Sequence, residues 1–141
     1  MTISPAVYTY TFVVSPEAID DNGHVNNVTY VQWMQEAAVR HYGALGGVGP
    51  MQALGATWVV RSHQIEYLAP AFAGDEIEVQ TWVVDLRRVR SLRRYEFLRR
   101  ADGKTLAKGE TEWVFVAVQT GRPLPIPEEV ACLFSLLPER K

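Results

Sequence analysis

The sequence predicts an α+β protein in which an antiparallel β-sheet wraps around one central α-helix. Two observations lead to this fold class. Five segments are rich in β-branched and aromatic residues and have strand-like patterning, at residues 7–14, 57–68, 76–86, 91–100 and 105–118. A segment near residues 30–42 has the period of a helix instead. One strand, one helix and then four strands in hairpin-like succession are typical of an antiparallel sheet with its helix on one face.

The first predicted strand and the predicted helix show these patterns clearly. Along residues 7–14, apolar side chains alternate with Thr9 and Thr11. The main apolar stripe of the helix consists of Tyr30, Trp33, Met34, Ala37 and His41. Val31, Ala38 and Tyr42 extend that stripe, so a curved sheet explains the helix better than a flat one.

The ends of the helix carry recognisable signals. Asn26, Asn27 and Thr29 each have a side chain that can cap its first N–H groups. Gly43 is placed to end the helix in a left-handed turn. A loop is expected after it, because residues 46–50 contain three glycines and a proline.

The remaining connections are also marked. Pro70 and Gly74 separate two strands, and an arginine-rich turn separates the next two. The Asp102-Gly103 pair predicts a hairpin between the last two strands. Pro127 is expected to start a short terminal helix that contains Cys132 as a buried structural residue.

Length and composition predict one folded domain over residues 1–141. Hydrophobic residues make up 48% of the chain, and the net charge of -2 argues against a protein that coats nucleic acid. Cys132 is the only cysteine, so no internal disulfide can form, and no zinc ligand set or cofactor motif is present. With neither a signal peptide nor a membrane span recognisable, the expected location is the cytoplasm.

The most informative segment is residues 19–30, with the sequence IDDNGHVNNVTY. It gathers two carboxylates, three asparagines and a histidine around one glycine, directly before the predicted helix. The N–H groups and the positive dipole end of a helix N-terminus favour developing negative charge. Thioester hydrolysis needs such donors together with a base or nucleophile. The alternative interpretation is a polar turn that only caps the helix.

This segment resembles the catalytic loop of the 4-hydroxybenzoyl-CoA thioesterase family of hotdog proteins. In that family an aspartate, a glycine three residues later and a tyrosine that opens the central helix recur, here Asp20, Gly23 and Tyr30. The segment is also similar to the D-x-N-x-H-V-N-N pattern of plant acyl-ACP thioesterases. The matching residues are Asp20, Asn22, His24, Val25, Asn26 and Asn27. The resemblance implies a hotdog fold and an acyl thioester substrate that contacts Tyr30.

The resemblance also implies a role for each matching residue. Asp20 is the expected catalytic carboxylate, which either attacks the thioester carbon or activates water. The backbone N–H of Asn27 is expected to polarise the thioester carbonyl, with help from the N–H of Gly23. Asn22 and His24 are expected to orient water or position the carboxylate, although His24 could instead brace the loop. No counterpart is found for the downstream glutamate or cysteine that some branches use.

The neighbouring carboxylate, Asp21, is the alternative catalyst. Adjacent side chains point in different directions where a strand gives way to a turn, and the match to the family pattern favours Asp20.

A second cluster is strongly basic. Seven of the 14 Lys and Arg residues lie within residues 87–100. The resemblance assigns Arg87, Arg88 and Arg90 to the phosphates of coenzyme A, as charge-assisted contacts would allow. Alternatively, the arginines pair with glutamates on neighbouring strands. RNA binding is less well supported, because no RNA-binding motif accompanies the charge.

The predicted function is therefore an acyl-CoA thioesterase, with an acyl-ACP thioesterase as its variant. A non-catalytic acyl-binding hotdog protein is the alternative from a different class. A hotdog dehydratase is disfavoured, because its histidine signature on the helix is absent. Hotdog relatives join their sheets edge to edge, so a homodimer or a homotetramer is expected.

Overall fold

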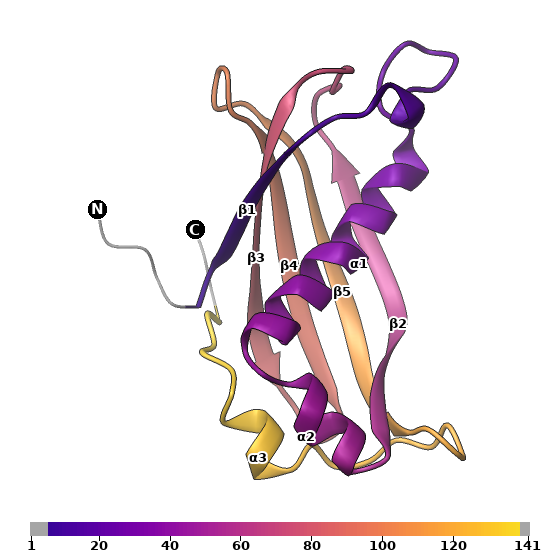
Figure 1. Ribbon diagram of the computed structural model, residues 1–141, viewed down its shortest axis with the longest axis vertical. Coiled ribbons are helices and arrows are strands. Elements are labelled where there is room, and N and C mark those ends of the chain that lie inside the picture. Colours follow the sequence, from indigo (N-terminus) through magenta and orange to yellow (C-terminus); the bar gives the residue numbers. More distant parts are fainter. Residues whose placement is uncertain (1–5, 139–141) are drawn as a thin grey trace.

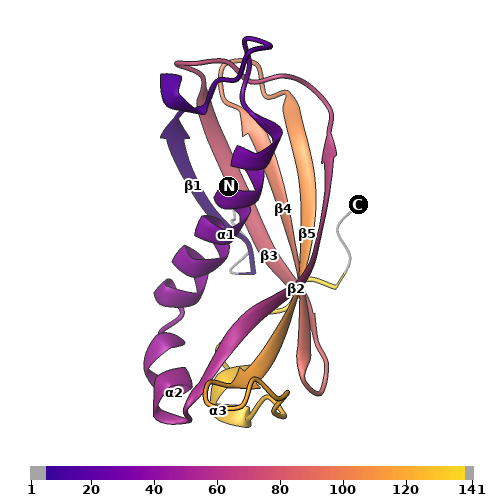
Figure 2. The same cartoon turned by 90° about the vertical axis from the view of Figure 1, so that its right-hand side faces the viewer.

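The computed structural model describes residues 6–138 and confirms the predicted α+β hotdog fold. The elements are β1 (Tyr8–Val13), η1 (Pro16–Ala18), α1 (Asn27–Ala44), α2 (Val48–Ala53), β2 (Ala56–Tyr67), β3 (Glu76–Leu86), β4 (Arg90–Arg99), β5 (Thr105–Ala117) and α3 (Glu128–Ala131). The five strands form one antiparallel sheet in the order β1-β3-β4-β5-β2. The long helix α1 lies across one face of this twisted sheet (Figures 1 and 2).

The path of the chain differs from the expected succession of hairpins. β3–β4 and β4–β5 are hairpins as predicted, but β2 pairs with β5 at the edge of the sheet and not with β3. Residues 68–75 therefore cross from one edge towards the other, where β3 pairs with β1. Pro70 and Gly74 mark the end of β2 and the approach to β3. Turn residues of this kind show where a strand ends, but they do not specify which strand it pairs with in the sheet.

The core lies between α1 and the sheet. The buried side chains of α1 are Tyr30, Trp33, Met34, Ala37, Ala38, His41 and Tyr42. They face alternate residues of the strands, such as Ile77, Val79 and Phe97, each of which is 0% exposed. A Cβ atom at Gly109 would lie 2.8 Å from the sulfur of Met34, so β5 has no side chain where Met34 of the helix packs against it. This fit holds α1 at one position along the sheet.

The helix is longer than its apolar pattern predicted. It begins after Asn26, whose side chain accepts a hydrogen bond from the N–H of Val28 at 2.8 Å. Asn26 is thus the cap among the three residues that were predicted as candidates. The prediction that Gly43 ends the helix is wrong, because α1 continues to Ala44 and Gly46 takes the left-handed conformation at φ 78°. Gly43 and Gly46 could each end the helix in a left-handed turn. The helix continues past Gly43, and Tyr42 in its last turn is buried.

The segment expected to be a loop forms the short helix α2. Pro50 lies in its first turn, where the missing N–H would have no intrahelical partner anyway. Gly47 lies against the ring of Tyr42, and a Cβ there would overlap it at 2.3 Å. Met51 packs against a second core cluster around Phe115 and Val130. Tertiary packing therefore outweighs the low helix propensity of this segment.

The terminal helix is correctly predicted, but the burial of Cys132 is not. Cys132 follows α3 and is exposed, with its sulfur 3.7 Å from the carbonyl of Glu129. Only Val130 is buried within α3. A single helical turn has too few residues for its apolar face to be recognised from periodicity.

A buried polar pair crosses the core at the C-terminal end of α1. His41 stacks on Tyr8, with 5.2 Å between ring centroids, and its Nδ1 lies 2.8 Å from Nη1 of Arg93. Burial and, secondarily, the charge of Arg93 lower the pKa of His41 from 6.5 to about 4. His41 is therefore neutral at physiological pH, with Arg93 donating the hydrogen bond.

No helix within residues 6–138 has the length and hydropathy needed to span a membrane. The same residues contain no group of three or more His, Cys, Asp and Glu side chains that could hold a metal ion.

The lowered pKa of His41 predicts a pH-dependent loss of stability. An unfolded chain protonates this histidine near pH 6.5, whereas the folded protein does so only near pH 4. The stabilisation is complete above pH 6.5 and is lost as the pH falls towards 4, by up to about 3 kcal/mol. Urea unfolding at several pH values should show this loss in the wild type. The His41→Asn variant should not show this loss, because its amide oxygen can accept the hydrogen bond from Arg93 without titrating. If the unfolding free energies of the wild type and the variant depended on pH in the same way, the prediction would be wrong.

Candidate active site

The loop before α1 is held in one conformation by its backbone. Ile19 and Val25 form an antiparallel bridge, and the N–H of Asp20 donates to the carbonyl of His24 at 3.0 Å. The N–H of Val25 donates to the carbonyl of Ala71 at 2.9 Å, which ties the loop to the connection between β2 and β3. Asp20 therefore lies in a closed turn that is anchored at both ends.

Asp20 and Asp21 have different surroundings. Asp20 is half-buried, and its Oδ1 accepts a hydrogen bond from the N–H of Asn22 at 2.9 Å. Asp21 is exposed, and its side chain has no hydrogen bond or ion pair within residues 6–138. Only Asp20 combines partial burial with an orientation fixed by the loop, which suits a reactive carboxylate.

Within the described residues, the first N–H group of α1, that of Asn27, makes no hydrogen bond. The N–H of Val28 donates to the side chain of Asn26, and the N–H of Thr29 donates to the carbonyl of Asn26 at 3.0 Å. The N–H of Asn27 lies at the positive end of the helix dipole, where an oxyanion would be stabilised.

Gly23 has a conformational role that the sequence suggested only in part. Its φ of 83° favours glycine, because a Cβ atom is strained in this region. Its N–H donates to the carbonyl of Asp20 at 3.0 Å, which closes the turn. The expected role of this N–H as a second oxyanion donor stays a prediction.

The other predicted residues of the loop lie close to Asp20 in sequence but make few contacts. Asn22 is exposed, and no hydrogen bond of its side chain is found within residues 6–138. His24 is half-buried, with Nδ1 3.5 Å from the carbonyl of Val25. Both side chains are therefore free to meet a ligand, and their expected roles stay predictions.

Tyr30 lies inside the core, below the helix N-terminus. It is 3% exposed, and its ring makes edge contacts with Trp33, Tyr67 and Phe97. Burial raises the pKa of Tyr30 to about 12, and its hydroxyl has no hydrogen bond within the described residues. Its expected contact with substrate is not tested by this arrangement and stays a prediction.

Tyr67 is a residue of the site that the motif did not identify. Its hydroxyl donates to the carbonyl of Asn27 at 2.8 Å and so links the end of β2 to the start of α1. The two residues are far apart in sequence, so only the position of β2 beside the helix could reveal the contact.

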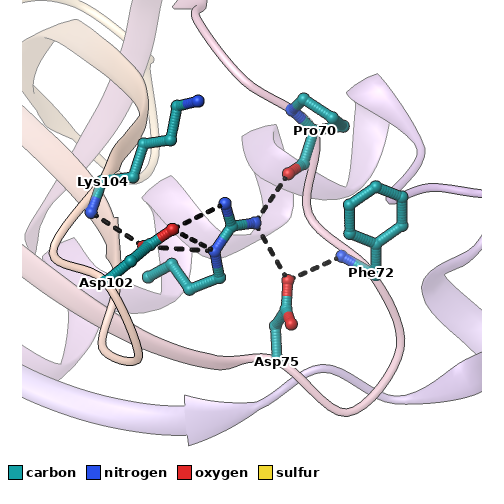
Figure 3. A network of polar contacts seen from close by, with 6 residues as sticks. Pro70, Phe72, Asp75, Asp102 and Lys104 are labelled. Carbon is teal, nitrogen blue, oxygen red and sulfur yellow. Dashed lines mark hydrogen bonds and ion pairs between the residues drawn. The ribbon is translucent and has the colours of Figure 1, made fainter.

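A network around Arg99 supports the connection that holds the loop (Figure 3). The guanidinium of Arg99 donates to both oxygens of Asp102 at 3.3 Å and 3.2 Å and to the carbonyl of Pro70 at 3.1 Å. Asp75 lies 3.4 Å from Arg99 and also accepts from the N–H of Phe72 at 3.0 Å. The β4–β5 turn is thereby joined to residues 68–75, which carry the Ala71 carbonyl that binds the active-site loop.

The basic cluster is divided among several locations. Three arginines pair with carboxylates on the sheet face that points away from α1: Arg90 with Glu112 at 3.4 Å, Arg94 with Glu110 at 3.7 Å and Arg100 with Glu76 at 3.8 Å. These cross-strand pairs agree with the alternative interpretation of the cluster. Arg93 is buried on the opposite face at 4% exposure. Arg87 lies 3.4 Å from Asp85, and the exposed side chain of Arg88 has no partner within residues 6–138.

Arg87, Arg88 and Arg90 do not come together with Asp20 in one chain. They belong to the β3–β4 turn and the start of β4, and this turn lies at the end of the sheet opposite the loop before α1 (Figure 1). The 11 residues of β3 separate the two ends, a distance of about 33 Å.

Comparisons with known proteins agree with the fold. The chain matches the family model described as the thioesterase-like superfamily over residues 14–134. No curated protein matches the chain in sequence.

Solved structures show the same architecture. A 1,4-dihydroxy-2-naphthoyl-CoA thioesterase from Synechocystis has a TM-score of 0.81 and 21% identity, over 90% of this chain and 94% of that one. A 12:0-ACP thioesterase from Umbellularia californica has a TM-score of 0.82 and 22% identity, over 92% of this chain but 51% of that one. The hypothetical protein SAV2348 from Staphylococcus aureus, in complex with CoA, has a TM-score of 0.84 and 20% identity, over 94% and 84% of the two chains.

At these identities the likeness to solved structures shows a shared fold, whereas the family model covers most of the chain and includes the Asp20 loop. The chain belongs to the thioesterase-like superfamily.

Proposed function

We propose that this protein is an acyl-CoA thioesterase that uses Asp20 as its catalytic base or nucleophile. The observation that carries the proposal is the N–H of Asn27 at the start of α1, which has no partner among residues 6–138 and follows directly after the loop that orients Asp20. Membership of the thioesterase-like superfamily supports thioesterase activity. The names of two structural neighbours, a CoA thioesterase and an ACP thioesterase, support the same reaction class.

The chemistry requires a carbonyl oxygen that becomes negatively charged. In the proposed site this oxygen accepts a hydrogen bond from the N–H of Asn27, and the helix dipole stabilises the charge. Asp20 then either attacks the carbonyl carbon, forming an anhydride that water hydrolyses, or removes a proton from an attacking water. Both routes release the free acid and the thiol of coenzyme A. Asn22 and His24 are proposed to orient the water.

Coenzyme A is favoured over an acyl-carrier protein as the carrier. An acidic carrier protein would need a broad basic surface. On the outer sheet face, arginines and lysines pair with acids, as Arg94 does with Glu110 and Lys108 with Glu96. The exposed Arg88, without a partner in the described part of the chain, suits a phosphate better than it suits a large protein surface. A purely acyl-binding protein would have no need for the oriented carboxylate of Asp20.

We propose a dimer that brings these arginines to the Asp20 site of a partner. β2 is a 12-residue strand at one edge of the sheet, and a long edge strand favours pairing with a second copy. Antiparallel pairing of two β2 strands about their centres would place the Ala56 end of one beside the Tyr67 end of the other. Tyr67 binds Asn27, and the Ala56 end lies at the same end of the sheet as the β3–β4 turn. Arg88 of one protomer would then serve the partner's Asp20.

Asp20→Asn is expected to lower the turnover number by roughly two to four orders of magnitude with little change in stability. The asparagine side chain can still accept the hydrogen bond from Asn22, so the turn remains closed. Initial rates of thiol release from the best acyl-CoA substrate measure the effect. Asp21→Asn is the matched control, because that side chain is exposed. Equal effects of the two substitutions would contradict the assignment of Asp20.

The proposed dimer has twice the mass of one 15.9 kDa chain, and an assembly of dimers has a higher even multiple of that chain mass. Light scattering coupled to size-exclusion chromatography, at the concentrations used for activity, measures this mass. A monomer in fully active solutions would rule out a site shared between protomers.

Arg88→Ala is expected to raise the Michaelis constant for acyl-CoA and to leave the turnover number nearly unchanged. Contacts to the nucleotide phosphates are made equally in the ground state and the transition state. The effect should weaken as salt rises. An acyl-pantetheine substrate lacks these phosphates and should be hydrolysed equally by both proteins. Losses of equal size on the two substrates would mean that Arg88 supports the fold or the chemistry instead.

A further inference from the structure

A cavity of about 190 Å³ lies at the C-terminal end of α1, far from the Asp20 loop of the same chain. Its walls come from α1, α2, three strands and the chain after α3, and include Tyr42, Met51, Trp58, Arg93, Trp113 and Phe134. Ala38, the first residue of α1 that lines the cavity, lies about 17 Å along the helix from Asn27. An engineered cavity of about 150 Å³ holds benzene, so this one can take a short chain or a ring.

The charged group of the cavity is Arg93. It is 4% exposed, and its Nη1 donates to His41 Nδ1 at 2.8 Å and to Thr81 Oγ1 at 3.1 Å. No carboxylate of residues 6–138 lies within ion-pair distance of Arg93. Burial lowers the pKa of Arg93 to about 10, which leaves the guanidinium charged at neutral pH. Within residues 6–138, no hydrogen bond from Nε or Nη2 of Arg93 is found, and a buried charge without a counter-ion is unfavourable.

Three further polar groups of the cavity walls are buried without a partner. Within the described residues, Tyr42 Oη, Trp58 Nε1 and Trp113 Nε1 make no hydrogen bond. Trp58 lies near the Tyr42 hydroxyl and Trp113 near the Tyr95 hydroxyl, and each indole offsets part of the rise in the tyrosine pKa that burial causes. An indole nitrogen can only donate, and the guanidinium of Arg93 adds further donors to the cavity. Buried polar groups normally find partners, and here a bound ligand can supply them.

We propose that this cavity binds a short ligand ending in a carboxylate, which pairs with Arg93. A carboxylate offers acceptors only, carries the missing negative charge and fits the fork of Nε and Nη2. The aromatic walls suit the methylene groups or ring that carry it. A simple alkyl group would leave the guanidinium and the indole donors without partners. The ligand is either a free dicarboxylic acid or the acyl group of the thioester, and the second form rests on the proposed function.

The proposed dimer supplies the route for an acyl group. Thr57 and Trp58, at the start of β2, line the cavity. Antiparallel pairing of two β2 strands would set this end beside the partner's Asn27 and Asp20. The thioester would be hydrolysed at the partner's loop while its far carboxylate reaches Arg93.

The test combines binding with hydrolysis. Glutarate and pentanoate have the same length and differ in one terminal carboxylate, and Trp58 and Trp113 provide a fluorescence signal in the cavity. The dissociation constant for glutarate is expected to be at least roughly tenfold lower than that for pentanoate. Likewise, kcat/KM for glutaryl-CoA is expected to exceed that for pentanoyl-CoA by at least roughly tenfold.

Arg93→Met should abolish both preferences, because it replaces the charge by an apolar group that can fill the space. Trp58→Phe keeps the aromatic wall and removes one donor, so it should reduce the preferences several-fold even if Arg93→Met does not fold. Preferential hydrolysis of glutaryl-CoA identifies the acyl group as the ligand. Selective binding of glutarate without hydrolysis of either thioester supports the carboxylate site and identifies a free acid as its ligand, and thiol release from the wider set of acyl-CoA substrates then decides the proposed function separately. The carboxylate site is overturned if the wild type and Arg93→Met each bind glutarate and pentanoate equally and hydrolyse glutaryl-CoA and pentanoyl-CoA equally. That result leaves the thioesterase proposal standing.

Discussion

The burial of one face of α1 against the five-stranded sheet decides where each functional group of this protein lies. Met34 approaches β5 at Gly109, where no side chain is present, and this contact sets the position of the helix along the strands. The N-terminus of α1 then lies at the Asp20 loop, where the N–H of Asn27 has no partner within the described part of the chain. Its C-terminal half carries His41, which meets Arg93 beside the cavity. One packing interaction thus places the proposed oxyanion donor and the charged pocket towards opposite ends of α1.

Contacts from distant parts of the chain hold the active-site loop. The Arg99 network joins the β4–β5 turn to residues 68–75, and Ala71 in that connection binds the loop at Val25. Tyr67 adds a hydrogen bond from β2 to Asn27. Catalytic groups need to be held by their surroundings to a fraction of an ångström, and these contacts come from three different strands or connections. The loop itself provides only the closed turn around Gly23.

Features that depend on local pattern could be predicted from the sequence, and features that depend on contacts over long distances could not. The alternation of residues 7–14 and the Asp102-Gly103 turn predicted β1 and the β4–β5 hairpin correctly. The pairing of β2 with β5 escaped prediction, because turn residues do not encode strand order. For the site, the motif located the Asp20 loop, whereas Tyr67 and Arg99 act through tertiary contacts. The arginines of residues 87–100 looked alike in the sequence. Neighbouring side chains in a strand point to opposite faces of the sheet, and the structure shows that Arg93 is on the buried face.

Release of free thiol by the purified wild-type protein tests the central claim most directly. Acyl-CoA substrates with short, medium, long and aromatic acyl groups are compared with an acyl-carrier-protein substrate at equal concentration. The account predicts catalytic turnover with at least one acyl-CoA and a lower kcat/KM for the same acyl group on the carrier protein. Saturable binding of acyl-CoA without thiol release from any substrate would contradict it, because the Asp20 loop and the Asn27 donor would then serve only to bind.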